Sequence, residues 1–433
     1  MSGFLSPYLS PYLSPYRVLD LSDERGLLAG HMLARLGADV VQVEPLAGNP
    51  ARFTGPFDDA LPPGDNSFYW SAWAAGKRSL GCDLANAEGR AVLQRLLTRA
   101  DFLLESADAD QRNAWGITPA QTGAAHPALV HVSVSAFGTS GPKAYWPATD
   151  LTVWAAGGPL LPNRDGDRAP LRISVPQTWQ HAAGDAAAGA LIAHFARLQT
   201  GRGQHVDVSA QASASICTLG ATLAAQYGHP DFVVPGAVAA PRRGLDLSGS
   251  GSRTRRSKWR VKDGLVEMHI GIGPAAGRFA NNLFRWLASE GACDADVANW
   301  DWVTLPQRVL AGELGEADLE RARDSVARFF AKFTKEELLG QAMARRLLCA
   351  PVATPRDLLA SRQLAQRGFF QTVTEASGAR RTLPGAFHAG VPQGFAELRP
   401  APSHGQHSNQ VLADWLAMPP NEVAALRAHG VIA

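Results

Sequence analysis

Cysteine and histidine are the residues whose spacing most directly reveals metal or disulfide chemistry. The four cysteines lie far apart and form no C-x-x-C pair: Cys82, Cys217, Cys293 and Cys349. This spacing argues against a disulfide framework or a cysteine zinc site, and it is typical of a protein of the reducing cytoplasm. Several histidines also lack the spacing of metal ligands: His31, His181, His194, His404 and His407. We therefore predict structural roles for them and no metal site.

Glycine-rich turns and arginine clusters are the next features that could do chemistry, because both can hold phosphates. Gly26 and Gly30 do not form a G-x-G-x-x-G turn, so the usual signal for a nicotinamide or flavin dinucleotide is absent. Residues 236–258 combine proline, glycine and serine with five arginines. We expect a long polar loop there.

The overall composition is that of a globular protein with no strong charge preference. Of 433 residues, 46% are hydrophobic and 18% are charged, and Lys+Arg 41 against Asp+Glu 39 leaves a net charge of +2. This balance gives no support for nucleic-acid binding or for an anionic membrane surface. No apolar run approaches the ~18 residues of a membrane span. The N-terminus does not resemble a signal peptide.

The elements that must position any site begin with strands that alternate with helices. RVLDL (17–21) is a short apolar strand, residues 24–36 have apolar residues at helical spacing, and ADVVQVE (38–44) is a second strand. Further alternation follows, including a helix at 86–99 and an alanine-rich helix at 180–199. This βαβ pattern predicts an α/β fold with a Rossmann-like, doubly wound parallel sheet.

The pattern also predicts how the chain divides into domains. Residues 1–16 contain LSPY three times, and their prolines predict an extended lead-in. Residues 17–215 would form the first part of a large domain, and 225–335 an inserted smaller α+β domain that carries the loop 246–256. Residues 345–433 would return to the large domain.

Several strings, in this order, resemble the family III CoA-transferases of the CaiB/BaiF type. They include LARLGADVVQVEPLAGNPAR (33–52), GKRSLGCDLANAEGR (76–90), VSAFGTSGPKAYWPATDL (134–151) and TGRGQHVDVSAQAS (200–213). APVATPRDLLASRQLAQRGFF (350–370) and APSHGQHSNQVL (401–412) extend the similarity toward the C-terminus. The resemblance therefore covers nearly the whole chain from Arg17.

The resemblance implies an interlinked dimer and a covalent mechanism. An aspartate of the family attacks an acyl-CoA thioester, forms a mixed anhydride and then carries CoA to an acceptor acid as an aspartyl thioester. Such a nucleophile divides one difficult exchange into easier steps. The implied partners are an acyl-CoA, a carboxylic acid and a second subunit, either identical or paralogous. The coenzyme A thioester would be a substrate, and no tightly bound cofactor is expected.

The position of the family's nucleophile is where this sequence departs from the pattern. Counting back from Thr200 without a gap places Trp179 there, and an indole cannot attack a thioester. Asp185 is the nearest acid, six residues or about 1.7 turns further along the helix. Asp150 resembles an acid that assists catalysis, but it could also cap a helix at 151–156. Thr149 replaces the histidine of the racemase branch, which makes an acyl-CoA racemase or isomerase the least favoured reading.

The cations expected around coenzyme A are also fewer than in the family. Pro45 and Ala85 stand at two positions where the family carries basic residues. The remaining candidates for contact with the CoA phosphates or for the active-site loop are Arg52, Lys77, Arg78, Arg112, Lys143, Gly249, Gly251 and Arg253, with Arg255 and Arg256 nearby. Two hypotheses remain open: a transferase that uses Asp185 and Asp150, or a partner subunit that has lost the nucleophile.

Overall fold

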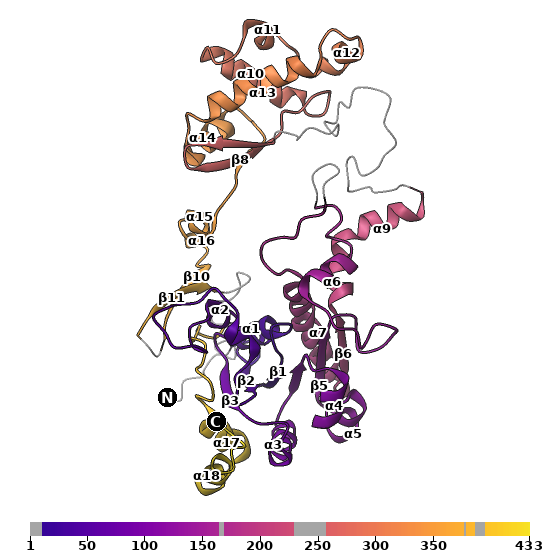
Figure 1. Cartoon of the computed structure of the whole chain (residues 1–433), viewed down its shortest axis with the longest axis vertical. Coiled ribbons are helices and arrows are strands. Elements are labelled where there is room, and N and C mark those ends of the chain that lie inside the picture. Colours follow the sequence, from indigo (N-terminus) through magenta and orange to yellow (C-terminus); the bar gives the residue numbers. More distant parts are fainter. Residues whose placement is uncertain (1–10, 164–168, 229–256, 376–377, 386–394) are drawn as a thin grey trace, which may run out of the picture. The chain divides into compact units, whose positions relative to one another are not determined.

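The computed structural model describes residues 11–163, 169–228, 257–375, 378–385 and 395–433. The chain divides into two compact units (Figure 1). Unit 1 comprises residues 1–163, 171–222 and 362–433, and unit 2 comprises residues 164–170 and 223–361. The predicted loop 246–256, with Gly249, Gly251 and Arg253, lies outside the described residues.

Unit 1 is built on a six-stranded sheet in which every neighbouring pair of strands is parallel. The strands are β1 (Arg17–Leu21), β2 (Asp39–Glu44), β3 (Arg78–Gly81), β4 (Phe102–Glu105), β5 (Val130–Ser135) and β6 (His205–Ser209). Their order is β3-β2-β1-β4-β5-β6, which reverses direction between β1 and β4. The prediction of a Rossmann-like parallel sheet is confirmed. The short apolar runs of the sequence form these strands because both faces of the sheet are covered.

Helices cover both faces of this sheet. One apolar core joins the sheet to α1 (Leu27–Arg35) and α7 (Thr178–Thr200), most of whose alanines face inward. The other core contains α3 (Ala87–Leu97), α17 (Ser408–Leu416) and α18 (Pro420–Ala428). On β1, Val18 belongs to the first core and Leu19 to the second, as alternation along a strand requires. The helices near the C-terminus thus cover one face of a sheet whose strands come from residues 17–209.

Unit 1 contains further short elements, mainly in the connections that follow the strands. They are η1 (Pro50–Phe53), α2 (Phe68–Trp73), α4 (Ala109–Trp115), α5 (Pro119–Ala125), α6 (Asp150–Ala156), α8 (Ala210–Ser215), η2 (Ile216–Thr218), α16 (Arg362–Gln366), β10 (Phe370–Thr374) and β11 (Arg380–Pro384). A further helix, α9 (Leu219–Gln226), spans the boundary between the units. Within the described ranges, no helix combines the length and the apolar character needed to cross a membrane.

Unit 2 combines a small antiparallel sheet with a bundle of helices. Its strands are β7 (Lys258–Val261), β8 (Gly264–Met268) and β9 (Cys349–Pro351), and its helices are α10 (Gly277–Ser289), α11 (Ala295–Ala298), α12 (Leu305–Leu310), α13 (Glu316–Phe330), α14 (Lys335–Ala344) and α15 (Pro355–Leu359). Aromatic side chains such as Trp259, Phe284 and Trp302 fill its core. The unit extends beyond residue 335 because β9 pairs with β8.

Residues 11–16, the last of the predicted lead-in, form a turn rather than an extended segment. Leu13 is buried, and its backbone N–H donates a hydrogen bond to the carbonyl of Leu36. The ring of Tyr16 packs edge-on against Phe102 and His194. Apolar contacts with α1 and α7 therefore fix this segment, so the extended form predicted from the prolines is wrong for residues 11–16.

His31 on α1 is a buried histidine that forms a hydrogen bond with the backbone after α2. Its Nδ1 lies 2.8 Å from the carbonyl oxygen of Ala75, an arrangement in which Nδ1–H donates. Burial lowers the pKa of His31 to about 4, and the charges of Lys77 and Arg35 act in the same direction, while the bond to Ala75 opposes them. The folded protein therefore holds His31 neutral at a pH where an unfolded chain would protonate it.

This depressed pKa predicts a loss of stability in mild acid. Above about pH 6.5 the imidazole is neutral in both states, and as the pH falls toward 4 only the unfolded state gains the proton, which costs the fold about 3 kcal/mol. The variant His31→Gln retains a side-chain donor for Ala75 and should lose most of this pH dependence. Urea unfolding at several pH values measures it. The surface variant His429→Gln should follow the wild-type curve, and an unchanged curve for His31→Gln would contradict the prediction.

Candidate functional site

A cleft with a volume of about 600 Å³ opens at the carboxyl ends of β1 to β4. Residues that follow all four strands line it, among them Ser22, Pro45, Asp83 and Ser106. In doubly wound sheets, ligands bind at this edge, at the point where the strand order reverses. The cleft includes that point, since residues after both β1 and β4 line it and these strands are neighbours. It is the candidate binding site of unit 1.

The lining of this cleft is more negative than positive. Four carboxylates line it, those of Asp23, Glu44, Asp83 and Asp110, against the one guanidinium of Arg25. Arg25 is already engaged, because its Nε and Nη2 donate to the Asp23 carboxylate at 2.6–3.0 Å. Among the described lining residues, no cation is therefore left without a carboxylate partner. Sequence patterns did not indicate Arg25, because only the turn after β1 brings it to the cleft.

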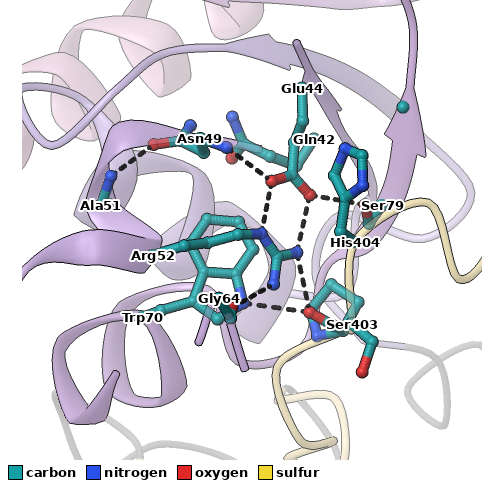
Figure 2. Close-up of polar contacts among 12 residues, drawn as sticks. Gln42, Glu44, Asn49, Ala51, Arg52, Gly64, Trp70, Ser79, Ser403 and His404 are labelled. Atoms are coloured by element: carbon teal, nitrogen blue, oxygen red, sulfur yellow. Dashed lines mark hydrogen bonds and ion pairs between the residues drawn. The ribbon is translucent and has the colours of Figure 1, made fainter. Parts of the chain in front are cut away.

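Glu44, which lines the cleft, is paired with Arg52, and both side chains are fully buried (Figure 2). Nε of Arg52 donates to one oxygen of Glu44 at 2.6 Å, and Nη2 donates to the other at 2.8 Å. The guanidinium also lies 3.9 Å from the centre of the Trp70 ring. The hydroxyl of Ser79 donates to Glu44, which ties β3 to the pair. Arg52 was predicted to contact CoA phosphates, but these contacts give its charge a structural role.

Lys77 has a comparable place inside unit 1. Its Nζ donates to Asp20 at 2.7 Å and to the side-chain oxygen of Gln42 at 2.8 Å, and both charged side chains are fully buried. Gly30 on α1 permits this arrangement, because a Cβ atom there would lie 2.0 Å from the Asp20 carboxylate. We therefore assign Lys77 to the interior of the fold rather than to a phosphate.

Three other predicted cations, Arg78, Arg112 and Lys143, belong to unit 1 and have different partners. Arg78 donates to Asp39 and Asp414, and buried Arg112 donates to the carbonyl of Ala107 at 2.7 Å. Lys143 lies over two aromatic rings, those of Phe137 and Trp146, at 5.3–5.5 Å. Of the three, only Lys143 has no carboxylate partner in the described part of the chain, and it does not line the cleft.

Asp150 binds the first turn of α7. Its carboxylate accepts backbone hydrogen bonds from Gln177, Thr178 and Trp179 at 2.8–3.3 Å. The helix that begins at Asp150 itself is capped by the Thr149 side chain instead. The expectation that Asp150 caps the helix at 151–156 is therefore corrected. An acid in this place both satisfies free N–H groups and complements the positive end of a long helix.

Trp179 and Asp185 lie on different faces of α7. Trp179 is buried in the core that α7 shares with α1 and the sheet. Asp185 is exposed, and no described residue forms a hydrogen bond or ion pair with its side chain. Six residues at 100° each rotate the side chain by about 120° relative to Trp179. The structure thus does not bring Asp185 together with Asp150.

A second polar cluster, which the sequence patterns did not reveal, lies around the start of α7. The side-chain amide of Gln180 donates to the hydroxyl of Tyr69 at 3.5 Å. Burial, with the nearby charge of Glu24, raises the pKa of Tyr69 to about 12. Burial, with the charge of Asp23, also raises the pKa of Glu24. Glu24 is a half-buried acid with an altered pKa, and only the folded turn after β1 distinguishes it from other glutamates.

Comparison with known proteins identifies the family. The model of CoA-transferase family III matches residues 13–408. The succinyl-CoA:(R)-benzylsuccinate CoA-transferase subunit BbsE of Thauera aromatica is 32% identical over 410 residues, which cover 92% of this chain and 93% of the relative. The chain belongs to CoA-transferase family III.

Other members of CoA-transferase family III resemble the chain over a similar length. The succinate–glutarate CoA-transferase of Agrobacterium fabrum is 26% identical, over 92% of this chain and 94% of the relative. The crystal structure of a CaiB/BaiF family protein from Brucella suis superposes with a TM-score of 0.74, over 94% of this chain and all of that chain, at 22% identity. This likeness agrees with the fold described above.

The buried pair of Glu44 and Arg52 predicts a large loss of stability when one partner is removed. The variant Arg52→Met should lower the free energy of unfolding by about 3–5 kcal/mol, because the Glu44 charge would remain buried without a counter-charge. The matched control is Arg95→Met, since Arg95 pairs with Glu422 on the surface. That change should cost less than about 1 kcal/mol. Urea unfolding compares the two, and equal losses would contradict a structural role for Arg52.

The two acids of the original hypothesis should differ in their effect on the fold. The variant Asp150→Ala removes three acceptor contacts from the start of α7. It should lower stability by about 1–2 kcal/mol. The variant Asp185→Ala should remain within about 0.5 kcal/mol of the wild type, because the side chain is exposed. Chemical unfolding of both variants tests this, and a reversed order would contradict the assignment of the α7 cap to Asp150.

Proposed function

We propose that this chain is a subunit of a CoA-transferase that moves coenzyme A from an acyl-CoA thioester to a carboxylic acid. Membership of CoA-transferase family III supports the reaction class. One similar relative is named for succinyl-CoA and (R)-benzylsuccinate, and another for succinate and glutarate. The acids in these names support a carboxylic acid as acceptor. In our proposal the nucleophilic carboxylate belongs to a second, paralogous subunit.

The observation that carries this assignment is buried Trp179 at the position that the family resemblance gives to the nucleophile. A carboxylate must attack the thioester carbonyl carbon, form the anhydride and release the CoA thiolate as the C–S bond breaks. An indole has no group that can do so. The neighbouring acids offer weak substitutes, because Asp150 is bound to the α7 backbone and Asp185 is exposed on another face.

The cleft at the carboxyl edge of the sheet also supports a catalytic role for the partner subunit. In this proposal the nucleotide end of coenzyme A would lie at this cleft, because ligands of doubly wound folds bind at the carboxyl ends of the strands. Phosphates are held by guanidinium or ammonium groups with free donors. Here Pro45 and Ala85 line the cleft, and Arg25 is paired with Asp23. We infer that this subunit holds coenzyme A weakly and that its partner supplies the stronger site.

An exposed apolar stripe on α7 supports an assembly of two chains. Ile192, Phe195 and Leu198 are each exposed by more than 60%, and Ile216 and Leu219 nearby in the sequence are exposed to a similar degree. A large exposed apolar patch is typical of a surface that another protein covers. We propose that a second subunit covers it and that the two chains interlink, as the family resemblance implies.

A second candidate is an independent transferase in which Glu24 replaces the missing nucleophile. Glu24 is half-buried, and its charge acts on Tyr69 beside the first turn of α7. Its raised pKa would favour the protonated form at low pH, so transfer through Glu24 would increase as the carboxyl ionises. Asp185 is the corresponding candidate from the sequence.

Trapping of a covalent intermediate separates these proposals. The purified chain is incubated with succinyl-CoA, treated with borohydride and digested, and the peptides are mapped by mass. We expect no modified carboxylate on this chain alone. In a complex isolated with its partner, we expect the modification on the partner's aspartate. Modification of Glu24 or Asp185, lost in Glu24→Gln or Asp185→Asn, would instead establish an independent transferase.

A further inference from the structure

Unit 2 contains a hollow of about 340 Å³ where two helices end. It lies beside the last turns of α10 and α14, and its lining residues are Asn282, Arg285, Trp286, Ser289, Ala344, Arg345 and Arg346. Three of these seven residues are arginines, and none is an acid. This hollow differs from the cleft of unit 1, in which carboxylates outnumber cations.

Two of the three arginines have free charged groups. Arg285 and Arg346 are exposed, and within the described ranges their guanidinium groups have neither an ion pair nor a hydrogen bond. Three like charges around one hollow repel one another, which is unfavourable unless an anion is present. The arrangement is therefore complementary to an anionic ligand.

Arg345 is held in place by the surrounding structure. Its guanidinium lies 4.6 Å from the centre of the buried Trp286 ring. The same group donates to the Gln341 side chain, and the amide of Asn282 donates to the Arg345 carbonyl at 3.0 Å. The floor of the hollow is thus fixed before any ligand arrives, which reduces the entropy lost on binding.

Arg346 occupies a backbone position that usually belongs to glycine. Its φ is +55°, and Leu347 N–H donates to the carbonyl of Ala342, which closes the end of α14. This left-handed cap is commonly glycine, because a side chain there costs about 1 kcal/mol. An arginine in this place costs some stability, and it adds a guanidinium to the lining of the hollow.

The negative charge at the two helix C-termini is smaller than the positive charge of the three arginines. Each C-terminus carries roughly half a negative charge, so two ends amount to about one. Three guanidinium groups exceed this by about two positive charges. The surplus corresponds to the charge of one phosphate group, which guanidinium groups bind through paired hydrogen bonds.

We propose that this hollow binds a phosphate group. Two sources share this chemistry: free inorganic phosphate, and the phosphorylated nucleotide end of a ligand such as coenzyme A. The site is contained within unit 2, and the inference stands independently of the function proposed above.

Thermal unfolding of the full chain tests the proposal with inorganic phosphate as the probe. Phosphate is titrated at constant ionic strength against chloride, and a saturable rise of Tm is expected for the wild type. Arg285→Ala should weaken the apparent affinity about tenfold or more, as expected for a lost charge-assisted hydrogen bond. The matched control is Arg278→Ala, an exposed arginine earlier on α10, which should bind phosphate like the wild type.

The variant Arg346→Gly should change the stability and the response to phosphate in opposite directions, relative to the wild type. Without phosphate this variant should have a higher Tm than the wild type, because glycine relieves the left-handed backbone. With phosphate it should gain less than the wild type. Ala417 has φ +50° at the end of α17, so Ala417→Gly should also raise the Tm but keep the full response to phosphate.

The source of the phosphate group is distinguished by a second titration, with adenosine 3′,5′-bisphosphate. Binding at least tenfold tighter than that of inorganic phosphate, and lost in Arg285→Ala, would assign the hollow to a nucleotide. Equal affinities would assign it to the free ion. The proposal is overturned if phosphate gives no saturable rise beyond chloride, or if Arg285→Ala and Arg278→Ala respond alike.

Discussion

The buried contact between Glu44 and Arg52 is the interaction on which the candidate site of unit 1 depends. Both side chains are almost completely removed from water, and together they join strands and loops that are far apart in the sequence. Arg52 donates to the carbonyl of Pro402, and Trp70 donates to the same oxygen, so the pair also binds the C-terminal segment. Burying two charges is costly, and complete hydrogen bonding is what makes it tolerable.

A second buried pair, Lys77 with Asp20, applies the same principle beneath α1. In both pairs a carboxylate holds a cation that the sequence had offered as a phosphate contact. Neither Arg52 nor Lys77 lines the cleft, whose described lining carries four carboxylates and one guanidinium. These two basic residues therefore stabilise the interior of unit 1.

At the start of α7, the residues likewise stabilise the fold and offer no nucleophile. The alanines of this helix pack against α1 and the sheet, and Trp179 extends that apolar core to the first turn. The Asp150 carboxylate accepts the N–H groups that a helix leaves free at its start. An apolar core and a capped terminus stabilise the element but provide no group that can attack a thioester. A partner subunit would supply what these residues do not.

The sequence by itself determined the parallel sheet, the long alanine-rich helix and the family, because these depend on local periodicity and on strings of neighbouring residues. RVLDL is β1 to the residue, and the predicted helix 180–199 corresponds to α7. The sequence also identified Trp179 as a departure from the family. Only the tertiary structure decided which partner each of these charged side chains has. Arg52 and Lys77 are buried in ion pairs, Asp150 caps α7 rather than its own helix, and Glu24 and Arg25 reach their positions through the turn after β1. A charged side chain looks alike in sequence whether it is solvated or paired, since its partner comes from a distant segment that only the fold brings near.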